Sequence, residues 1–323
     1  MRAMAGNINP ATVYSIFISN QIDYVFSVWY LQELIMSMHL KNFISVTRLN
    51  KPIGFLLLFW PCSWGLSIAH YYQRDIDIFF YYVLLFFFGS VLMRSAGCIV
   101  NDIVDAKIDK KVYRTKTRPI ASGSLSKNLA WIYVLILCLI AFLILIQFNL
   151  LTICLGMFSM LFAFSYPFMK RFTYWPQLFL GFTFNWGIIM AWTAITNEIS
   201  YQPILLYAGA IFWTLGYDTI YGVQDISDDE VIGVKSTAIK FKDKIGLFVG
   251  TCYLISSVAI VLVMINLKLN YCLFFLLFFI LTLFYQLKIC KKKDPDECFR
   301  AFKLNNFSGM LVFFGFFLIS FDI

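Results

Sequence analysis

The sequence predicts an all-α integral membrane protein with about nine transmembrane helices. Of its 323 residues, 60% are hydrophobic and only 14% are charged, whereas soluble globular proteins average roughly 45–50% and about 25%. Long apolar segments recur along the chain, and each approaches the roughly 20 residues that a helix needs to cross a bilayer. The lipid bilayer is therefore an expected partner. The same composition excludes disordered, collagenous and nucleic-acid-binding classes.

The predicted spans follow the apolar segments in chain order: 52–70, 78–100, 129–148, 151–168, 176–196, 203–221, 245–265, 271–288 and 304–321. Residues 43–323 are predicted to form one transmembrane domain. Residues 1–42 mix Asn, Asp and Glu with short apolar stretches, so we expect an N-terminal extension, interfacial or flexible, and no cleaved signal. Two interpretations of this extension stay open, an interfacial helix at Tyr24–Leu40 or a translation start at Met36 or Met38.

Basic residues are distributed unevenly between the predicted loops. Nineteen of the 26 Lys and Arg residues lie in four segments: 101–128, 168–175, 222–244 and 288–303. The alternate loops hold only Arg74 and Lys268. Since cytoplasmic loops carry an excess of Lys and Arg, the four basic segments are predicted to face the cytoplasm, with the N-terminus inside and the C-terminus outside. The formal charge of +8 therefore marks orientation and requires no nucleic-acid partner.

Scarce acidic residues gather in two short clusters. They comprise Asn101, Asp102, Asp105 and Asp109 after the second span, and Asp218, Asp225 and Asp229 after the sixth. Aspartates spaced i, i+3, i+7 in the first cluster and i, i+7, i+11 in the second share a helical face. Both clusters are predicted on the same side of the membrane. Two clusters facing each other in this way suggest a shared site, although a single one could be a set of solvated loop charges.

Stacked carboxylates repel one another, so a compensating cation is expected. Asp and Asn oxygens are hard ligands that suit Mg²⁺. This ion commonly takes one or two carboxylates and completes its octahedron with water and substrate phosphate. Two facing clusters are therefore predicted to hold a diphosphate between Mg²⁺ ions.

Basic side chains near the clusters are candidates for the diphosphate oxygens. They lie in the segment Arg114-Thr-Lys116-Thr-Arg118, which follows the first cluster, and in Lys170-Arg171, which follows the fourth span. Guanidinium and ammonium groups bind such oxygens well, although a topology signal would also explain basic loops. Arg94 lies inside the second span, where an arginine needs a polar cavity or a partner. A ligand contact and a structural salt bridge to Asp102 or Asp218 both stay open.

Several segments together resemble one family. Segment 93–109, MRSAGCIVNDIVDAKID, resembles the N-D-x-x-D-x-x-x-D signature of UbiA-type intramembrane prenyltransferases. Further similar segments are 48–54 (RLNKPIG), 114–123 (RTKTRPIASG), 166–171 (YPFMKR), 217–229 (YDTIYGVQDISDD) and 232–237 (IGVKST). The resemblance covers roughly residues 43–321, and it favours the 4-hydroxybenzoate polyprenyltransferase branch.

The resemblance implies a ring of nine helices around a central cavity that opens laterally to lipid. It also implies a Mg²⁺-dependent enzyme of ubiquinone biosynthesis. This enzyme would transfer a polyprenyl group from polyprenyl diphosphate to the carbon of 4-hydroxybenzoate ortho to its hydroxyl. The catalytic carboxylates would be Asp102, Asp105, Asp109, Asp218, Asp225 and Asp229. Asp218 would polarise the phenol. The other five, together with Asn101, would hold the metal ions. Diphosphate ligands would be Lys116, Arg118 and Arg171, and either Arg48 or Arg94 would hold the acceptor carboxylate.

One position departs from the family pattern. Asn50 stands where an aspartate is expected before Lys-Pro-Ile-Gly, so the role of this position stays open. The resemblance further implies a multi-pass protein of the bacterial inner membrane with its active site opening to the cytoplasm, or of the mitochondrial inner membrane in a eukaryote. The alternatives are another aromatic or haem prenyltransferase of the superfamily, and a cation transporter that uses the membrane-edge aspartates.

Overall fold

The structure, a computed structural model, describes residues 38–267, 273–291 and 293–321. The chain separates into two compact units, Met1–Ser45 and Val46–Ile323. In the first unit the described residues, 38–45, are helical. Most of the predicted interfacial helix Tyr24–Leu40, and Met36 with it, lies outside the described residues. In the second unit every described regular element is a helix.

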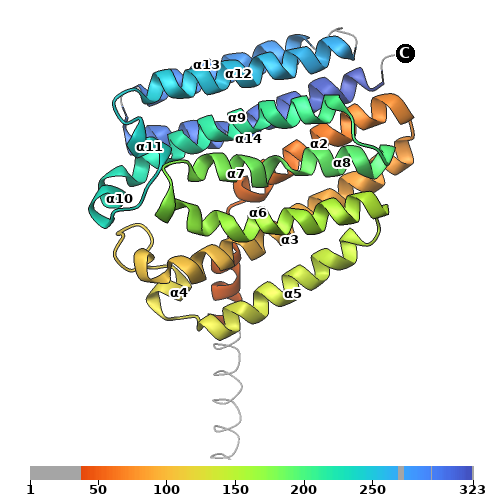
Figure 1. Cartoon of the computed structure of the whole chain (residues 1–323). Helices are drawn as coiled ribbons and strands as arrows, with labels where there is room; N and C mark the ends of the chain where they lie inside the picture. The colour runs from red at the N-terminus through yellow and green to blue at the C-terminus, as the bar shows by residue number, and fades with distance from the viewer. Residues whose placement is uncertain (1–37, 268–272, 292, 322–323) are drawn as a thin grey trace, which may run out of the picture. The chain divides into compact units, whose positions relative to one another are not determined.

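The second unit is a bundle of long helices that run back and forth (Figure 1). The long helices are α2 (Ile53–Gln73), α3 (Ile76–Asp109), α5 (Lys127–Leu145), α6 (Leu150–Phe172), the pair α7 (Pro176–Asn185) and α8 (Gly187–Thr196), α9 (Tyr201–Gly222), α12 (Ile245–Asn266), α13 (Leu273–Cys290) and α14 (Pro295–Ile319). The short elements are α4 (Pro119–Ser122), the 3₁₀ turn η1 (Val223–Asp225), α10 (Ile226–Ile232) and α11 (Thr237–Lys240). Side chains of Asp75, Ser126 and Asn149 cap α3, α5 and α6, each accepting a hydrogen bond from a backbone amide of the first turn.

Each of the nine predicted spans overlaps a helix within the described residues. Eight helical segments there are long and apolar enough to cross a membrane, with α7 and α8 counted as one. The span predicted at 203–221 is α9, which is less apolar than the others. Its 22 residues extend about 33 Å at about 1.5 Å per residue, and it packs against α12, α7 and α14. Thr214, Tyr217 and Thr219 of α9 are buried in these contacts. The predicted all-α membrane fold is confirmed.

The span predicted at 176–196 is interrupted between α7 and α8. At this point α8 approaches α2 closely enough to require glycine on both helices. A Cβ atom on Gly187 would lie 2.3 Å from the sulfur of Cys62, and one on Gly65 would lie 2.4 Å from the carbonyl oxygen of Ile188. Small residues at helix crossings allow this backbone approach in membrane bundles, and they bring α8 onto the centre of the second unit.

The outward faces of the peripheral helices carry large apolar side chains, as expected where lipid is the solvent. On α5, Leu135, Leu139 and Leu143 are exposed, whereas Ala130 and Val134 are buried.

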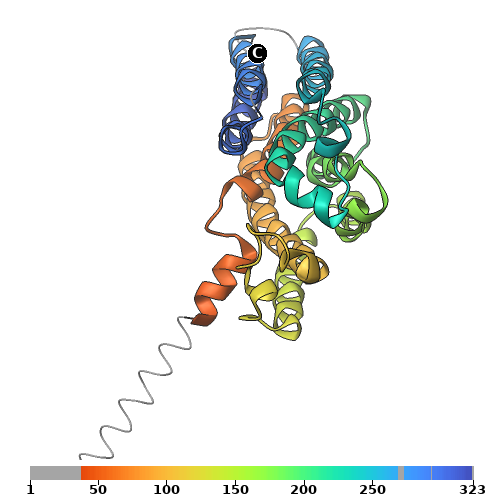
Figure 2. The same cartoon turned by 90° about the vertical axis from the view of Figure 1, so that its left-hand side faces the viewer.

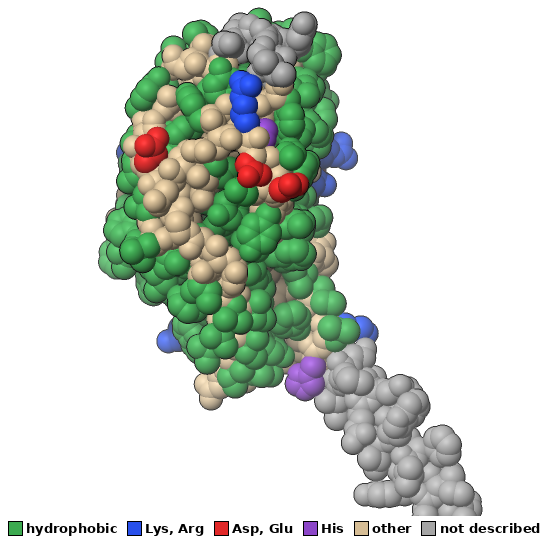
Figure 3. All heavy atoms as spheres, turned by 90° about the vertical axis from the view of Figure 1, so that its right-hand side faces the viewer, with side chains coloured by type: hydrophobic (Ala, Val, Ile, Leu, Met, Phe, Trp, Pro, Cys, Tyr) green, Lys and Arg blue, Asp and Glu red, His purple; other side chains and the backbone are tan. Residues whose placement is uncertain are grey.

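The two ends of the bundle differ. Figure 2 shows α4, α10 and α11 gathered at one end with the connecting loops, whereas Figure 3 shows the other end as mostly hydrophobic, with few charged side chains. The charged loops are therefore grouped at one end of the second unit.

A network of buried polar side chains links α9, α12, α13 and α14. The hydroxyl of Tyr253 donates to Gln286 Oε1 at 2.6 Å, and Asn305 Nδ2 donates to the same oxygen at 2.9 Å. The indole N–H of Trp213 donates to Asn305 Oδ1 at 2.9 Å. All four side chains are buried. Because an unpaired polar group is costly in a dry interior, these bonds favour one rotation and register of the four helices.

Replacement of Asn305 by Ala is expected to destabilise the bundle, because the Trp213 N–H would lose its acceptor. A buried unsatisfied donor costs about 1–3 kcal/mol, which should lower the thermal unfolding midpoint of the purified protein in detergent. Thr251→Ala is the matched control, since this exposed hydroxyl donates to the Leu247 carbonyl of its own helix. Equal midpoints for the two variants would show that the network does not hold the helices together.

Candidate functional site

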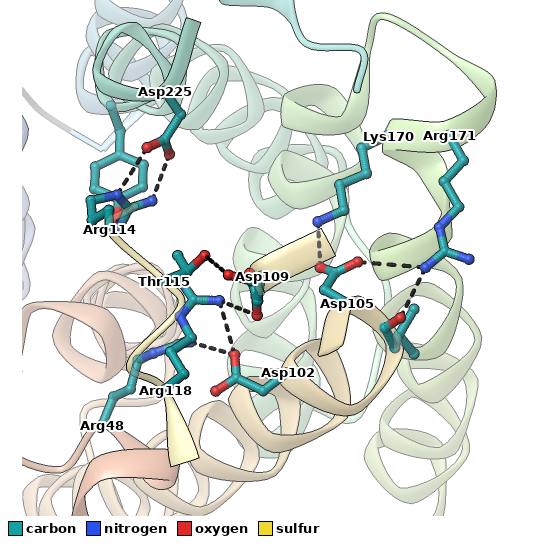
Figure 4. A network of polar contacts seen from close by, with 12 residues as sticks. Arg48, Asp102, Asp105, Asp109, Arg114, Thr115, Arg118, Lys170, Arg171 and Asp225 are labelled. Carbon is teal, nitrogen blue, oxygen red and sulfur yellow. Dashed lines mark hydrogen bonds and ion pairs between the residues drawn. The ribbon is translucent and has the colours of Figure 1, made fainter. Parts of the chain in front are cut away.

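Acidic and basic side chains meet at the end of the bundle that carries α4, α10 and α11. Figure 4 shows this network from close by. The C-terminal part of α3 supplies the first acidic cluster, and η1 with α10 supplies part of the second. The cations come from the turn before α2, the loop between α3 and α4, and the last turn of α6.

The first cluster is buried along α3. Asp102, Asp105 and Asp109 expose only 1%, 1% and 5% of their surface. Arg118 Nη1 donates to Asp102 Oδ1 at 3.1 Å and to Asp109 Oδ2 at 2.9 Å, and Arg48 Nη2 donates to Asp102 Oδ1 at 2.5 Å. Buried carboxylates are costly unless they are paired, so the two guanidinium groups stabilise this arrangement. The bridging Arg118 shows that Asp102 and Asp109 lie on the same side of the helix.

The last turn of α6 pairs with the middle of the cluster. The ammonium group of Lys170 forms an ion pair with Asp105 Oδ2. Arg171 Nη2 lies 3.6 Å from Asp105 Oδ1 and donates to the Val104 carbonyl at 3.0 Å. These contacts, visible in Figure 4, fix the end of α6 against α3. Two cations therefore converge on one buried carboxylate.

Arg114 joins the loop between α3 and α4 to the second acidic cluster. Its Nε donates to Asp225 Oδ1 at 2.9 Å and its Nη2 donates to Asp225 Oδ2 at 2.6 Å. Its Nη1 also donates to the Tyr221 hydroxyl at 3.3 Å. Burial alone would lower the pKa of Arg114, but the contacts with Asp225 and Tyr221 outweigh burial and raise this pKa. The bidentate ion pair thus fixes the loop that follows the first cluster to the second cluster (Figure 4).

Asp229, one helical turn after Asp225, is half-buried. Burial and the nearby negative charge of Asp225 raise the pKa of Asp229 to about 6. Among the residues that the structure describes, Asp229 makes no ion pair within 4 Å. This carboxylate therefore lacks the close counter-charge that its neighbour Asp225 receives from Arg114.

Arg94 lies on α3 about two turns before the first cluster. Its guanidinium carbon lies 5.1 Å from the centre of the Phe184 ring. Its Nε atom is buried without a hydrogen-bond partner, and a Cβ atom on Gly54 would lie 2.9 Å from it. In the described part of the chain Arg94 makes no ion pair within 4 Å, so the predicted salt bridge to Asp102 or Asp218 is not formed. An arginine with this surrounding is available to an anionic ligand.

Seven of the predicted site residues take part in ion pairs, which form three separate groups: Arg48, Asp102, Arg118 and Asp109 in the first, Asp105 and Arg171 with Lys170 in the second, and Asp225 with Arg114 in the third. Asn101 is half-buried on α3, and Asp218 is half-buried on α9. Lys116 is exposed, and its ammonium group lies 4.4 Å from the centre of the Tyr113 ring. The structure therefore does not place Lys116 against the carboxylates.

Two basic residues of the network, Arg114 and Lys170, were not singled out as diphosphate ligands from the sequence. Both lie in the basic segments that the sequence places beside the clusters. Lys170 directly precedes Arg171 at the end of a predicted span, and Arg114 lies four residues before Arg118. These spacings are the signals that would have pointed to them, but a loop sequence does not define where its side chains reach.

The carboxylates suit a divalent metal ion. Within the described residues, no three His, Cys, Asp or Glu side chains already converge as a metal site. However, Asp102 Oδ2 and Asp105 Oδ1 are buried without a hydrogen-bond partner. Arg171 Nη2 lies 3.6 Å from Asp105 Oδ1 without forming a hydrogen bond, and carboxylate oxygens are the hard ligands that Mg²⁺ takes. The donor set therefore fits such an ion, provided that some of the basic side chains move to an anion.

The sequence pattern of the UbiA prenyltransferase family matches residues 58–314. The 4-hydroxybenzoate octaprenyltransferase of Vibrio atlanticus is 42% identical over 279 residues, which cover 86% of this chain and 97% of that relative. The enzyme of the same name from Blochmanniella pennsylvanica is 40% identical over 278 residues, covering 85% of this chain and 94% of the relative.

Solved structures agree on the fold. A UbiA homologue from Aeropyrum pernix, in its apo form, superimposes with a TM-score of 0.70 at 21% identity and covers 81% of this chain and 97% of its own. A UbiA homologue from Archaeoglobus fulgidus, bound to GPP and Mg²⁺, has a TM-score of 0.63 at 13% identity and covers 86% of this chain and 99% of its own. With a family match over most of its length, relatives at about 40% identity and the same helical fold, this chain belongs to the UbiA prenyltransferase family.

Proposed function

We propose that this multi-pass membrane protein is a 4-hydroxybenzoate polyprenyltransferase, which catalyses an early membrane step of ubiquinone biosynthesis. It transfers a polyprenyl group from polyprenyl diphosphate to the ring carbon ortho to the hydroxyl of 4-hydroxybenzoate. The observation that carries this proposal is the 42% identity to a 4-hydroxybenzoate octaprenyltransferase over 97% of that enzyme. The paired acidic and basic clusters support it, and family membership disfavours the cation-transporter alternative.

The donor head group is proposed to bind between the two acidic clusters. Metal ligands are proposed to be Asn101, Asp102, Asp105, Asp109, Asp225 and Asp229. Bound Mg²⁺ would supply positive charge that stabilises the departing diphosphate. Arg118, Arg171 and Lys170 already lie at the carboxylates, so they can turn to diphosphate oxygens over a short distance. Lys116 stays a prediction as a diphosphate ligand.

The acceptor carboxylate is proposed to bind Arg94. Arg48 is already paired with Asp102 at 2.5 Å, whereas the Nε atom of Arg94 is buried and unpartnered. A carboxylate that enters a dry cavity needs a charged partner, and a guanidinium can bind it through two parallel hydrogen bonds. The structure therefore favours Arg94 in the choice that the sequence left open.

The chain's own residues then determine the course of the reaction. The allylic C–O bond breaks, and the diphosphate leaves with its electron pair toward the basic side chains. The ring carbon ortho to the hydroxyl forms the new C–C bond and then loses its proton, which the released diphosphate accepts. Asp218 is proposed to accept a hydrogen bond from the phenol, which increases the electron density of the ring. The charged end of the bundle is proposed to lie on the cytoplasmic side of the inner membrane, as the distribution of basic loops predicts.

Purified protein supplied with Mg²⁺, a polyprenyl diphosphate and 4-hydroxybenzoate is expected to yield a prenylated hydroxybenzoate of the corresponding mass. Benzoate, which lacks the activating hydroxyl, serves as the matched acceptor and should give no product. EDTA should abolish turnover, and added Mg²⁺ should restore it. Full turnover in a metal-free preparation, or a preference for a different acceptor in a mixed panel, would refute the proposal.

Asp105→Ala and Asp225→Ala are each expected to reduce prenyl transfer by about a hundredfold or more, since each removes charge at the reacting head group. Lys291→Ala is the control, because Lys291 is an exposed residue of a basic loop and should keep nearly full activity. Initial rates and membrane insertion are measured for all three variants. If the three lose activity equally, the aspartates act through folding and not through the site.

Arg94→Ala is expected to raise the KM for 4-hydroxybenzoate by roughly ten- to a hundredfold, because a charged hydrogen bond contributes about 1.5–3 kcal/mol. The KM for the polyprenyl diphosphate should change much less. Arg74→Ala, a charge change in the loop at the other end of α3, should leave both constants unchanged. Steady-state kinetics with each substrate varied in turn separate these outcomes, and an unchanged acceptor KM would exclude Arg94 from this role.

A further inference from the structure

The two acidic clusters differ in how many of their carboxylate oxygens are hydrogen-bonded. In the first cluster, Asp102 Oδ2 and Asp105 Oδ1 are buried without a hydrogen-bond partner, although the other oxygen of each carboxylate is paired and Arg171 Nη2 lies 3.6 Å from Asp105 Oδ1. A cation that reached these oxygens would not have to displace every basic side chain. The first cluster therefore keeps carboxylate oxygens that form no hydrogen bond in the empty protein.

The second cluster is closed by one residue. Arg114 occupies both oxygens of Asp225, at 2.9 and 2.6 Å. Asp229 carries no ion pair in the part of the chain that the structure describes, but a single carboxylate offers a weak site. Asp225 and Asp229 can therefore bind one metal ion together only after Arg114 has left.

We propose that Arg114 is a placeholder cation that blocks the second metal position until the diphosphate arrives. This inference rests on the proposed Mg²⁺–diphosphate site. In the empty protein, Arg114 neutralises Asp225. When the donor binds, its diphosphate attracts Arg114 away from Asp225, and a metal ion takes the vacated carboxylate. One residue thereby couples donor binding to metal binding.

The geometry allows such an exchange. Arg114 lies in the loop between α3 and α4, and its side chain is 40% exposed, whereas that of Asp225 is 19% exposed. The guanidinium can therefore swing without repacking of the helices. Asp225 is held more firmly, because Tyr221, one turn before it, packs against Phe302 of α14 with ring centres 4.6 Å apart. The arginine is the mobile partner, and the carboxylate is the fixed one.

Electrostatics determines the direction of the exchange. A metal ion that displaced Arg114 without an anion present would leave a guanidinium beside a new divalent charge, which is unfavourable at short range. The diphosphate removes this penalty, because it binds both the guanidinium and the metal. Metal and donor should therefore each strengthen the binding of the other by the same factor, as linkage requires. Loss of Arg114 should weaken this coupling.

Binding of Mn²⁺, followed by electron paramagnetic resonance, tests the proposal without turnover. The wild-type protein is expected to bind one Mn²⁺ tightly, and a second only when geranyl diphosphate is added at a fixed concentration of free Mn²⁺. Arg114→Gln should bind the second ion without the diphosphate, with an affinity raised by up to about fivefold, as expected for loss of a partly exposed bidentate ion pair. The same variant should bind geranyl diphosphate more weakly than the wild type.

Lys111→Gln is the matched control, because it makes the same change of charge on an exposed residue of the same loop. It should leave the Mn²⁺ stoichiometry as in the wild type, and unfolding midpoints of both variants verify that they are folded. Unchanged metal binding in Arg114→Gln would overturn the placeholder role while leaving the prenyl-transfer proposal intact. Failure of Mn²⁺ to bind any of the proteins, even with geranyl diphosphate, would instead count against the metal site of the proposed function.

Discussion

The site depends on the requirement that charge inside a membrane protein be neutralised locally. A carboxylate at the membrane end of a helix cannot remain unpaired at low cost. The buried aspartates of α3 therefore have basic partners, which come from three other places in the sequence: Arg48, Arg118 and Lys170. These ion pairs hold the turn before α2, the loop after α3 and the end of α6 around one helix. The charges that are proposed to bind the substrate also assemble the end of the bundle.

Much of the fold could be predicted from the sequence, because lipid imposes a strong length and polarity pattern on each span. The interruption between α7 and α8 could not, since segment 176–196 is apolar enough to be a single span. Gly187, at the start of α8, packs closely against Cys62 of α2, a contact that the sequence does not reveal. The acidic members of the candidate site could be predicted from their helical spacing. Arg114 could not, because the reach of a loop side chain is decided by tertiary structure. The choice between Arg48 and Arg94 likewise required knowing which of them already had a partner.

The length of α3 suits the proposed role of the acidic cluster, which is buried and yet would serve a water-soluble head group. Its 34 residues extend about 51 Å at about 1.5 Å per residue, well beyond a hydrocarbon core of about 30 Å. Asp102, Asp105 and Asp109 occupy the last turns of this helix, so we infer that they lie near the membrane interface. A diphosphate bound there, as proposed, would leave its attached prenyl chain in the hydrocarbon.

The polar network of Trp213, Tyr253, Gln286 and Asn305 has a consequence for the exchange of segments between related enzymes. Each side chain has a partner on a different helix, so the donors and acceptors of the hairpin α13–α14 are complementary to those of α9 and α12. A chimaera that imports this hairpin from a relative with other polar residues would leave donors and acceptors of α9 and α12 unmatched within the membrane. Recombination of these enzymes should therefore succeed only when all four helices are inherited together.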